Sequence, residues 1–175
     1  MAHLIEFRGR KPSVHRTAFV APTAVLIGDV EVGPESSVWF GAVLRGDHPT
    51  HGIRVGARSS IQDNCVLHVS DEGPTLVGED ATIGHGAVFE SCEVRRGALV
   101  GMNAVVLHRA VVGEDSLVAA GSVVPAGMDV PSRSLVAGAP ATVRRSLGDE
   151  AVAAIREGAE HYVVLSRAYL EGGIG

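Results

Sequence analysis

Two histidines and a glutamate are the residues in this sequence with the most evident capacity for chemistry. His68, His85 and Glu90 offer two imidazole nitrogens and a carboxylate, a sensible ligand set for a divalent metal ion such as Zn²⁺. Further polar residues lie near them in the chain: Arg45, Asp47, Gln62 and Asp63. Single polar residues are usually just solvated, so the question is whether the fold brings these side chains together.

A six-residue repeat dominates the chain and predicts that fold. Apart from two insertions and one five-residue step, every sixth position is large and apolar: Val20, Leu26, Val32, Val38, Leu44, Val55, Ile61, Leu67, Val77, Ile83, Phe89, Val94, Val100, Val106, Val112, Val118, Val124, Val130 and Val136. The residue four positions later is usually small, and glycine often follows the apolar residue directly. A β-sandwich would instead show a period of two.

Coils of three short strands joined by tight corners explain the repeat. The large residue points inward, the small residue fits beside it, and glycine is expected to tolerate the dihedral angles of the turn. Stacked coils pair one another's backbone groups and bury a continuous core. The sequence therefore predicts an all-β protein, a single-stranded parallel β-helix.

The repeat stops beyond Ala141, and helical spacing of apolar residues follows over residues 148–170. We expect one C-terminal helix packed along the β-helix, with Asp149 near its start and a potential interruption at Gly158. The predicted organisation is one domain, with the β-helix in residues 1–145 and the helical segment in residues 146–175.

Composition and charge argue against several kinds of partner. The net charge is −5 and the basic residues are scattered, which disfavours nucleic acid and anionic membrane surfaces. The first residues contain no apolar run long enough for a signal peptide or a membrane span. Cys65 and Cys92 form no CxxC pair and are expected to be buried, so a cytoplasmic location fits best.

The register of the repeat predicts which polar residues are neighbours. Three repeats make one coil, so residues that follow every third apolar position should form a ladder with a spacing of about 4.8 Å: Arg45, His68 and Glu90. On a neighbouring edge, the same argument places Gln62 beside His85. Both insertions, residues 47–52 and 70–74, leave the coils from one region, so a polar cluster is expected near two excursion loops: Arg45, Asp47, Gln62, Asp63, His68, His85 and Glu90.

At these residues the sequence resembles a known family, the γ-class carbonic anhydrases and their relatives, including proteins encoded with phenylacetate and carnitine catabolism. The matching segments are VLRGD (43–47), SSIQDNCVLHV (59–69), TIGHGAVFESC (82–92), ALVGMNAVVLHRAVVGEDSLVAAGSVV (98–124), LVAGAPATVRR (135–145) and AEHYVVLSRAY (159–169). The resemblance covers nearly the whole chain. Many acyltransferases share the repeat, but RGD, IQD with VLHV, and GHG in this order are more specific.

The resemblance implies a left-handed β-helix, a homotrimer and a metal site at each subunit interface. His68 matches one metal ligand, and His85 matches a second ligand that the neighbouring subunit donates. Arg45 and Asp47 match an ion pair that helps to hold the trimer together.

The implied activity is reversible hydration of carbon dioxide to bicarbonate with Zn²⁺, or with Fe²⁺ or Co²⁺. A bound metal lowers the pKa of water from about 15.7 towards 7, so hydroxide is present at neutral pH. Gln62 and Asp63 match residues that orient this water and its hydrogen-bond partners. Tyr162 matches a tyrosine that the C-terminal helix brings near the site.

One position departs from the family's pattern, because Glu90 stands where the third histidine ligand is expected. Glu90 could complete a ligand set of two histidines and one glutamate, with a weaker Lewis acid as the consequence of its charge. Alternatively, the site is empty and the chain is a non-catalytic homologue. His48 is a candidate replacement ligand or proton shuttle, and Glu90 is a candidate shuttle if it does not ligate the metal. His51 and His108 are weaker candidates.

A further alternative is a hexapeptide-repeat enzyme that acts on acyl-coenzyme A. Such acyltransferases and thioesterases also use clefts between subunits and a histidine base. The C-terminal coils show no evident coenzyme-binding signature, which disfavours acyl transfer, whereas thioesterase activity stays open.

Overall fold

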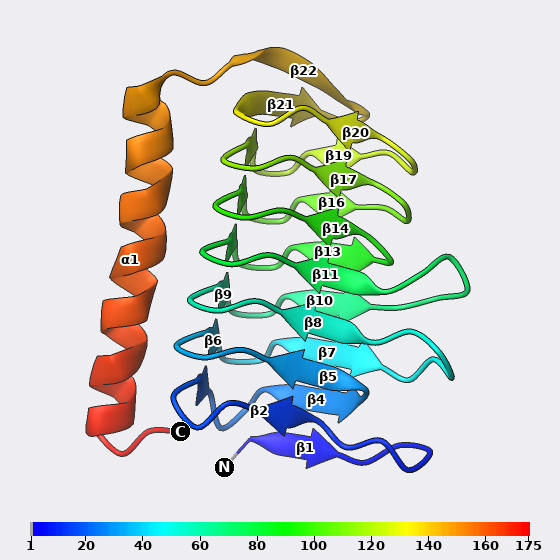
Figure 1. The fold of residues 1–175 in the computed structure, drawn as a ribbon, viewed down its shortest axis with the longest axis vertical. Helices are drawn as coiled ribbons and strands as arrows, with labels where there is room; N and C mark the ends of the chain where they lie inside the picture. Colours follow the sequence, from blue (N-terminus) through cyan, green and yellow to red (C-terminus); the bar gives the residue numbers. More distant parts are fainter. Residues whose placement is uncertain (1) are drawn as a thin grey trace.

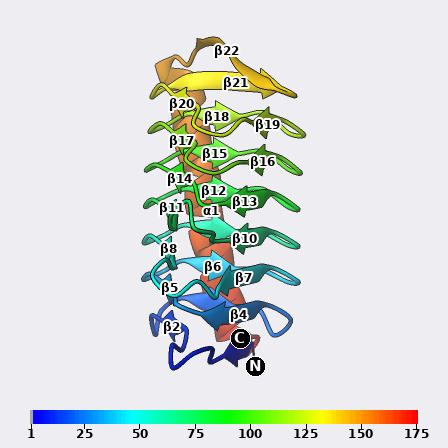
Figure 2. The same ribbon diagram turned by 90° about the vertical axis from the view of Figure 1, so that its right-hand side faces the viewer.

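The computed structural model describes residues 2–175, which form a column of stacked coils with one helix alongside it (Figure 1). Each coil contributes one strand to each of three sheets, called here sheets A, B and C. Figure 2 shows the sheets rising in parallel columns, with α1 behind them. The predicted fold, an all-β parallel β-helix with a C-terminal helix, is confirmed.

Sheets A and B contain seven parallel strands each. Sheet A consists of β1 (His3–Ile5), β4 (Val25–Gly28), β7 (Val43–Gly46), β10 (Val66–His68), β13 (Val88–Glu90), β16 (Val105–Val106) and β19 (Val123–Val124). Sheet B consists of β2 (Ser13–Val14), β5 (Val30–Val32), β8 (Ile53–Val55), β11 (Thr75–Val77), β14 (Glu93–Val94), β17 (Val111–Val112) and β20 (Asp129–Val130).

Sheet C has eight strands among residues 2–175 and is capped by an antiparallel strand. Its strands are β3 (Phe19–Val20), β6 (Ser37–Val38), β9 (Ser60–Ile61), β12 (Thr82–Ile83), β15 (Leu99–Val100), β18 (Leu117–Val118), β21 (Ser134–Gly138) and β22 (Ala141–Ser146). β22 pairs antiparallel with β21 and ends the column. The chain runs from sheet A to B to C in every coil, which creates three kinds of corner.

The repeated apolar residues fill the inside of the column as predicted. Every member of the series is buried, and the small residues four positions later, such as Ala42 and Ala87, are also buried. Cys65 and Cys92 are buried free thiols, and burial raises their pKa values, to about 11 for Cys65. The core is therefore one continuous apolar column.

The glycines that follow the apolar residues have a different role from the one expected. Their φ angles lie outside the left-handed region, and an added Cβ at any of them would lie 2.5–3.0 Å from backbone nitrogen in the next coil: Gly33, Gly56, Gly78, Gly84, Gly101 and Gly113. The left-handed residue lies two positions later, for example at Glu35 and Arg58. The prediction that these glycines supply the turn's dihedral angles is wrong; they permit close stacking of backbones.

The helix α1 (Asp149–Glu171) covers sheet C and runs back along the column (Figure 1). It begins and ends one residue later than the expected segment and is not interrupted at Gly158. Its buried residues pack on sheet C, which explains why the face is apolar: Val152, Ile155, Ala159, Val163 and Ser166. Within residues 2–175, no helix is long and apolar enough to span a membrane.

Candidate metal site

The predicted ladder of polar residues exists on sheet A. His68 in β10 is the in-register neighbour of Arg45 in β7 and of Glu90 in β13. The apolar residues that precede them stack inside the column, so these three side chains point outward from it. His68 and Glu90 thus lie on adjacent strands, with a spacing that allows both side chains to reach one ligand.

The Arg45–Asp47 ion pair lies at one end of this ladder. The Arg45 Nη1 and Asp47 Oδ2 atoms are 2.7 Å apart, and Asp47 Oδ1 is 4.0 Å from His68 Nε2. Burial and the Arg45 charge lower the pKa of His68, against the opposing charges of Asp47 and Glu90. A lowered pKa favours the neutral imidazole, the form of histidine that binds metals.

His85 lies at the corner that joins sheets C and A, where its main chain and its ring are both held. The Gln62 Oε1 atom accepts a hydrogen bond from the His85 backbone N–H at 3.1 Å, and Gln62 is only 5% exposed. The His85 Nδ1 atom lies 2.8 Å from Asp63 Oδ2, and Asp63 Oδ1 accepts the N–H of Phe40 at 3.2 Å. A carboxylate on Nδ1 fixes the tautomer and leaves Nε2 available to a metal, as in many metal sites.

One chain does not bring all of the candidate ligands together. In residues 2–175, no group of three or more histidine, cysteine, aspartate or glutamate side chains is arranged to hold a metal ion. His68 and Glu90 end their strands of sheet A, beside the excursion loops at the corner between sheets A and B, whereas His85 lies at the opposite corner, between sheets C and A. Each chain therefore presents the candidate ligands as two separate groups. The prediction of one polar cluster near the loops is wrong for Gln62, Asp63 and His85, because the insertions leave the column at the other end of sheet A.

His48 lies near His68, but both of its ring nitrogens are engaged. Its Nε2 is 2.8 Å from Asp71 Oδ1, and its Nδ1 accepts the backbone N–H groups of Thr50 and His51 at 3.3 and 3.2 Å. The His48 ring thus bonds within the first excursion loop, residues 47–52, and links it to the second, residues 70–74. A role as ligand or proton shuttle would require one of these contacts to open.

The two weaker histidine candidates lie apart from the ladder. The His51 ring stacks on His48, with centroids 4.6 Å apart. His108 lies in the corner between β16 and β17, beyond both excursion loops along the column.

Tyr162, on α1, lies near the corner between sheets C and A that holds Asp63 and His85. Its ring packs edge-on against Trp39 at a centroid distance of 5.6 Å. Partial burial, and then the charge of Asp63, raise the pKa of its phenol. The helix therefore places this hydroxyl close enough to the corner to experience Asp63, the carboxylate that orients His85.

An N-terminal hairpin also borders the site, and the repeat pattern gave no indication of it. Phe7 and Arg10 pair across a two-residue turn in which Arg8 and Gly9 both have positive φ. Phe7 and Arg8 line a surface depression of about 340 Å³ together with Asp47, His48 and His68 among others. The glycine of the Arg8-Gly9 dipeptide, which tolerates positive φ, is the one signal that could have revealed this third excursion.

The fold defines a hexapeptide-repeat β-helix, and comparisons with known proteins agree. A family model described as "Bacterial transferase hexapeptide (six repeats)" matches residues 91–126. A "Probable carbonic anhydrase" of Methanocaldococcus jannaschii is 50% identical over 153 residues, which cover 87% of this chain and 95% of that protein. The chain belongs to the γ-class carbonic anhydrase family.

Two further similarities define how far the match extends. "Gamma carbonic anhydrase 2, mitochondrial" of Arabidopsis thaliana is 41% identical over 166 residues; the match covers 91% of this chain but 59% of that longer protein. A solved structure of a putative acetyltransferase from Bacillus cereus superimposes with a TM-score of 0.93 at 36% identity and covers 96% of each chain. Proteins with this fold thus have names from two enzyme classes, carbonic anhydrases and acetyltransferases.

Proposed function

We propose that this protein catalyses the reversible hydration of carbon dioxide to bicarbonate at metal sites shared between copies of the chain. The observation that carries the proposal is the division of the ligands: His68 and Glu90 face outward on sheet A, while Asp63 orients His85 at the adjacent corner. The family names of the relatives support this reaction.

The donor set fits a divalent ion, with Zn²⁺ as the first choice and Fe²⁺ or Co²⁺ as alternatives. His68 and Glu90 of one copy and His85 of the next would hold it, a set of two imidazoles and one carboxylate. Such an ion supplies a Lewis acid that activates water for attack on carbon dioxide at neutral pH. Glu90 makes that Lewis acid weaker than three histidines would, because it brings a negative charge.

The other polar residues of the site would orient water and hold the neighbouring side chains in place. Gln62 uses its carbonyl on the His85 backbone, so its NH₂ group is available to orient a water molecule. Arg45 holds Asp47 beside His68, and the Tyr162 hydroxyl adds a donor near the corner. For proton export we retain His48, which would take up a proton on Nδ1 once its backbone contacts open and release one from Nε2 to the fully exposed Asp71.

An exposed column of valines supports assembly into a homotrimer. The second outward-facing row of sheet A is apolar over six successive coils: Val25, Val43, Val66, Val88, Val105 and Val123. Val66 and Val88 are 38% and 40% exposed, directly beside His68 and Glu90. Covering this column with a second copy would bury apolar surface and could bring that copy's His85 to the ladder.

Metal content and carbon dioxide hydration, measured on one preparation, test the proposal. We expect about one metal ion per chain and hydration activity, with both lost in His68→Ala and His85→Ala. His15→Ala is the matched control, because His15 contacts Thr17 elsewhere on the column. A wild-type protein that binds zinc but leaves the hydration rate at the uncatalysed level would contradict the proposal.

Activity on an acyl-coenzyme A thioester is the second candidate. The similarity to a putative acetyltransferase and the depression of about 340 Å³ beside His68 favour it. Hydrolysis of acetyl-coenzyme A that depends on His68, in a protein without hydration activity, would select this alternative. A protein with neither activity and no bound metal would be a non-catalytic member of the family.

A further inference from the structure

A ladder of charged turn residues climbs the corner between sheets B and C. One residue per coil occupies the left-handed turn position, and each donates its backbone N–H to the coil before it: Arg58 to Pro34, Asp80 to Ala57, Gly97 to Glu79, Asp115 to Arg96 and Arg133 to Glu114. With Glu35 in the coil before Arg58, the side-chain charges along the corner run negative, positive, negative, none, negative, positive.

The helix α1 carries a complementary row of charges in the opposite direction. Four ion pairs join the two rows: Glu35 with Arg167, Arg58 with Glu160, Asp115 with Arg156, and Arg133 with Asp149. The four helix residues are spaced 7, 4 and 7 residues apart, which places them on one stripe of the helix. Eighteen residues of helix extend about 27 Å, and five coil spacings extend about 24 Å.

The alternation of charge selects one register of the helix. A slip by one helical turn, about 5.4 Å, is close to one coil spacing. Such a slip would bring Glu160 next to Glu35 or Asp80 instead of Arg58. Like charges would then face each other, so the ion pairs discriminate between registers that the apolar stripe alone would tolerate.

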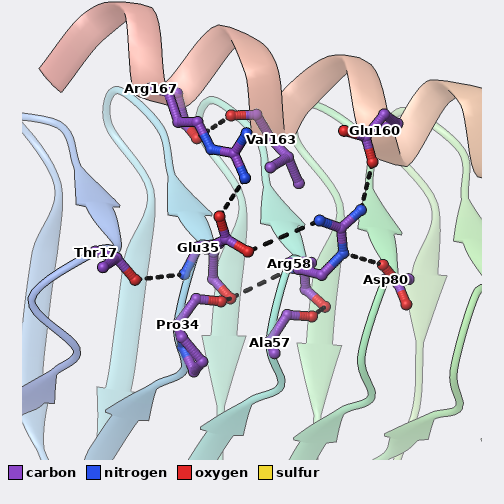
Figure 3. Close-up of polar contacts among 12 residues, drawn as sticks. Thr17, Pro34, Glu35, Ala57, Arg58, Asp80, Glu160, Val163 and Arg167 are labelled. Atoms are coloured by element: carbon purple, nitrogen blue, oxygen red, sulfur yellow. Dashed lines mark hydrogen bonds and ion pairs between the residues drawn. The ribbon is translucent and has the colours of Figure 1, made fainter. Parts of the chain in front are cut away.

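Arg58 is the hub of this arrangement (Figure 3). Its guanidinium bonds Glu160 on the helix and Asp80 in the next coil, the latter at 2.8 Å, and lies 3.8 Å from Glu35. Glu35 in turn binds Arg167, one ion pair further along the helix. The Arg58 side chain is 33% exposed, the least of the arginines in these four ion pairs. The fork of the guanidinium allows one side chain to hold two coils and the helix.

Tyr162 lies on the opposite side of the same helical turn. It lies two positions after Glu160, a rotation of about 200°. That rotation carries the ring into an aromatic cluster with Trp39 and Tyr169, at the edge of sheet C that adjoins sheet A. Holding Glu160 on one side of the helix therefore fixes Tyr162 on the other.

We infer that Arg58 is a positioning residue that sets the register of α1 and thereby holds Tyr162 at the Asp63–His85 corner. The catalytic consequence rests on the proposed function, whereas the placement of the helix does not. Arg58 lies at the corner between sheets B and C, and Tyr162 reaches the corner between sheets C and A. The effect of Arg58 on Tyr162 must therefore pass through α1.

Trp39, the single tryptophan of the chain, provides a local probe of this placement. Arg58→Ala should red-shift Trp39 emission and increase its quenching by acrylamide, with the helix content by circular dichroism unchanged. In the hydration assay, kcat should fall on the order of 10-fold, the effect expected from a displaced side chain at a site. Arg58→Lys should recover part of both signals, because lysine keeps the charge without the fork.

Arg156→Ala is the matched control, since it removes a bidentate pair with Asp115 on the same stripe, one helical turn before Glu160. It should leave emission and kcat near wild type. Equal effects of the two variants, or none in either, would overturn the inference. Glu160→Gln tests the same contact if Arg58→Ala does not fold. A wild type without hydration activity would refute the proposed function, and Trp39 fluorescence would still decide the role of Arg58.

Discussion

Replacing Gly84 with alanine should destabilise the protein, although alanine is usually the more favourable residue. A Cβ at Gly84 would lie 2.7 Å from the backbone nitrogen of Met102 and 2.9 Å from backbone atoms of Gly101 and Val100. These atoms belong to the next coil and cannot move as a flexible side chain would. Overpacking of this kind costs about 1–3 kcal/mol. For a chain of this size that corresponds to a fall of about 2–12 °C in Tm.

Gly158→Ala is the matched control because an added Cβ there meets no atom within 4 Å and the residue lies inside α1. It should stabilise the protein by about 0.5–1 kcal/mol, since glycine is a poor helix residue. Thermal unfolding at one fixed protein concentration measures both variants, because the proposed assembly would make Tm depend on concentration. Gly84 precedes His85, so Gly84→Ala should also reduce metal content. A Gly84→Ala protein as stable as Gly158→Ala would refute the argument from close stacking.

Three further changes test the site, the exposed face and the core. Glu90→His should raise metal occupancy and hydration rate, because it adds an imidazole and removes a negative charge, whereas Glu90→Gln should lower occupancy. Equal metal content in the wild type and both variants would show that residue 90 does not ligate the metal. Val88→Asp should dissociate the assembly in sedimentation experiments, whereas Val164→Asp, at a 55% exposed position on α1, should not; an intact Val88→Asp assembly would exclude sheet A as the interface. Phe89→Ala should lower the free energy of unfolding by about 3–5 kcal/mol in urea titrations, because the ring is fully buried, and a loss below 1 kcal/mol would contradict its place in the core.

The ladder of Arg45, His68 and Glu90 could be predicted because the repeat has a constant period. Once three repeats are assigned to a coil, the position of every outward side chain follows, and β7, β10 and β13 pair in the predicted register. The insertions do not disturb this register because they leave and rejoin at the same corner.

The role of the glycines was predicted incorrectly because the sequence shows only that a side chain is missing. Left-handed φ and close contact between backbones both favour glycine, and the period cannot separate them. The structure assigns close contact to Gly84 and left-handed φ to charged residues such as Arg58. Gly158 does not interrupt α1, because the cost of one glycine, about 1 kcal/mol, is small beside the burial of Ile155 and Ala159.

The ion pairs between α1 and the corner could not be predicted from spacing. Their partners lie up to 132 residues apart, and the pairing depends on the direction and rotation of a helix outside the repeat. The N-terminal hairpin was missed for a related reason, since Phe7 and Arg10 precede the first repeat. The ion pairs depend on tertiary contacts, whereas the hairpin is a local turn that lies outside the period.

Complementation between two inactive variants tests the shared site most directly. His68→Ala and His85→Ala should each assemble but hydrate carbon dioxide no faster than buffer. Coexpressed in equal amounts, they should regain about one quarter of wild-type activity, because one interface in four then receives His68 from one copy and His85 from the next. Mixed assemblies that remain inactive, under conditions in which the wild type is active, would contradict a site divided between copies.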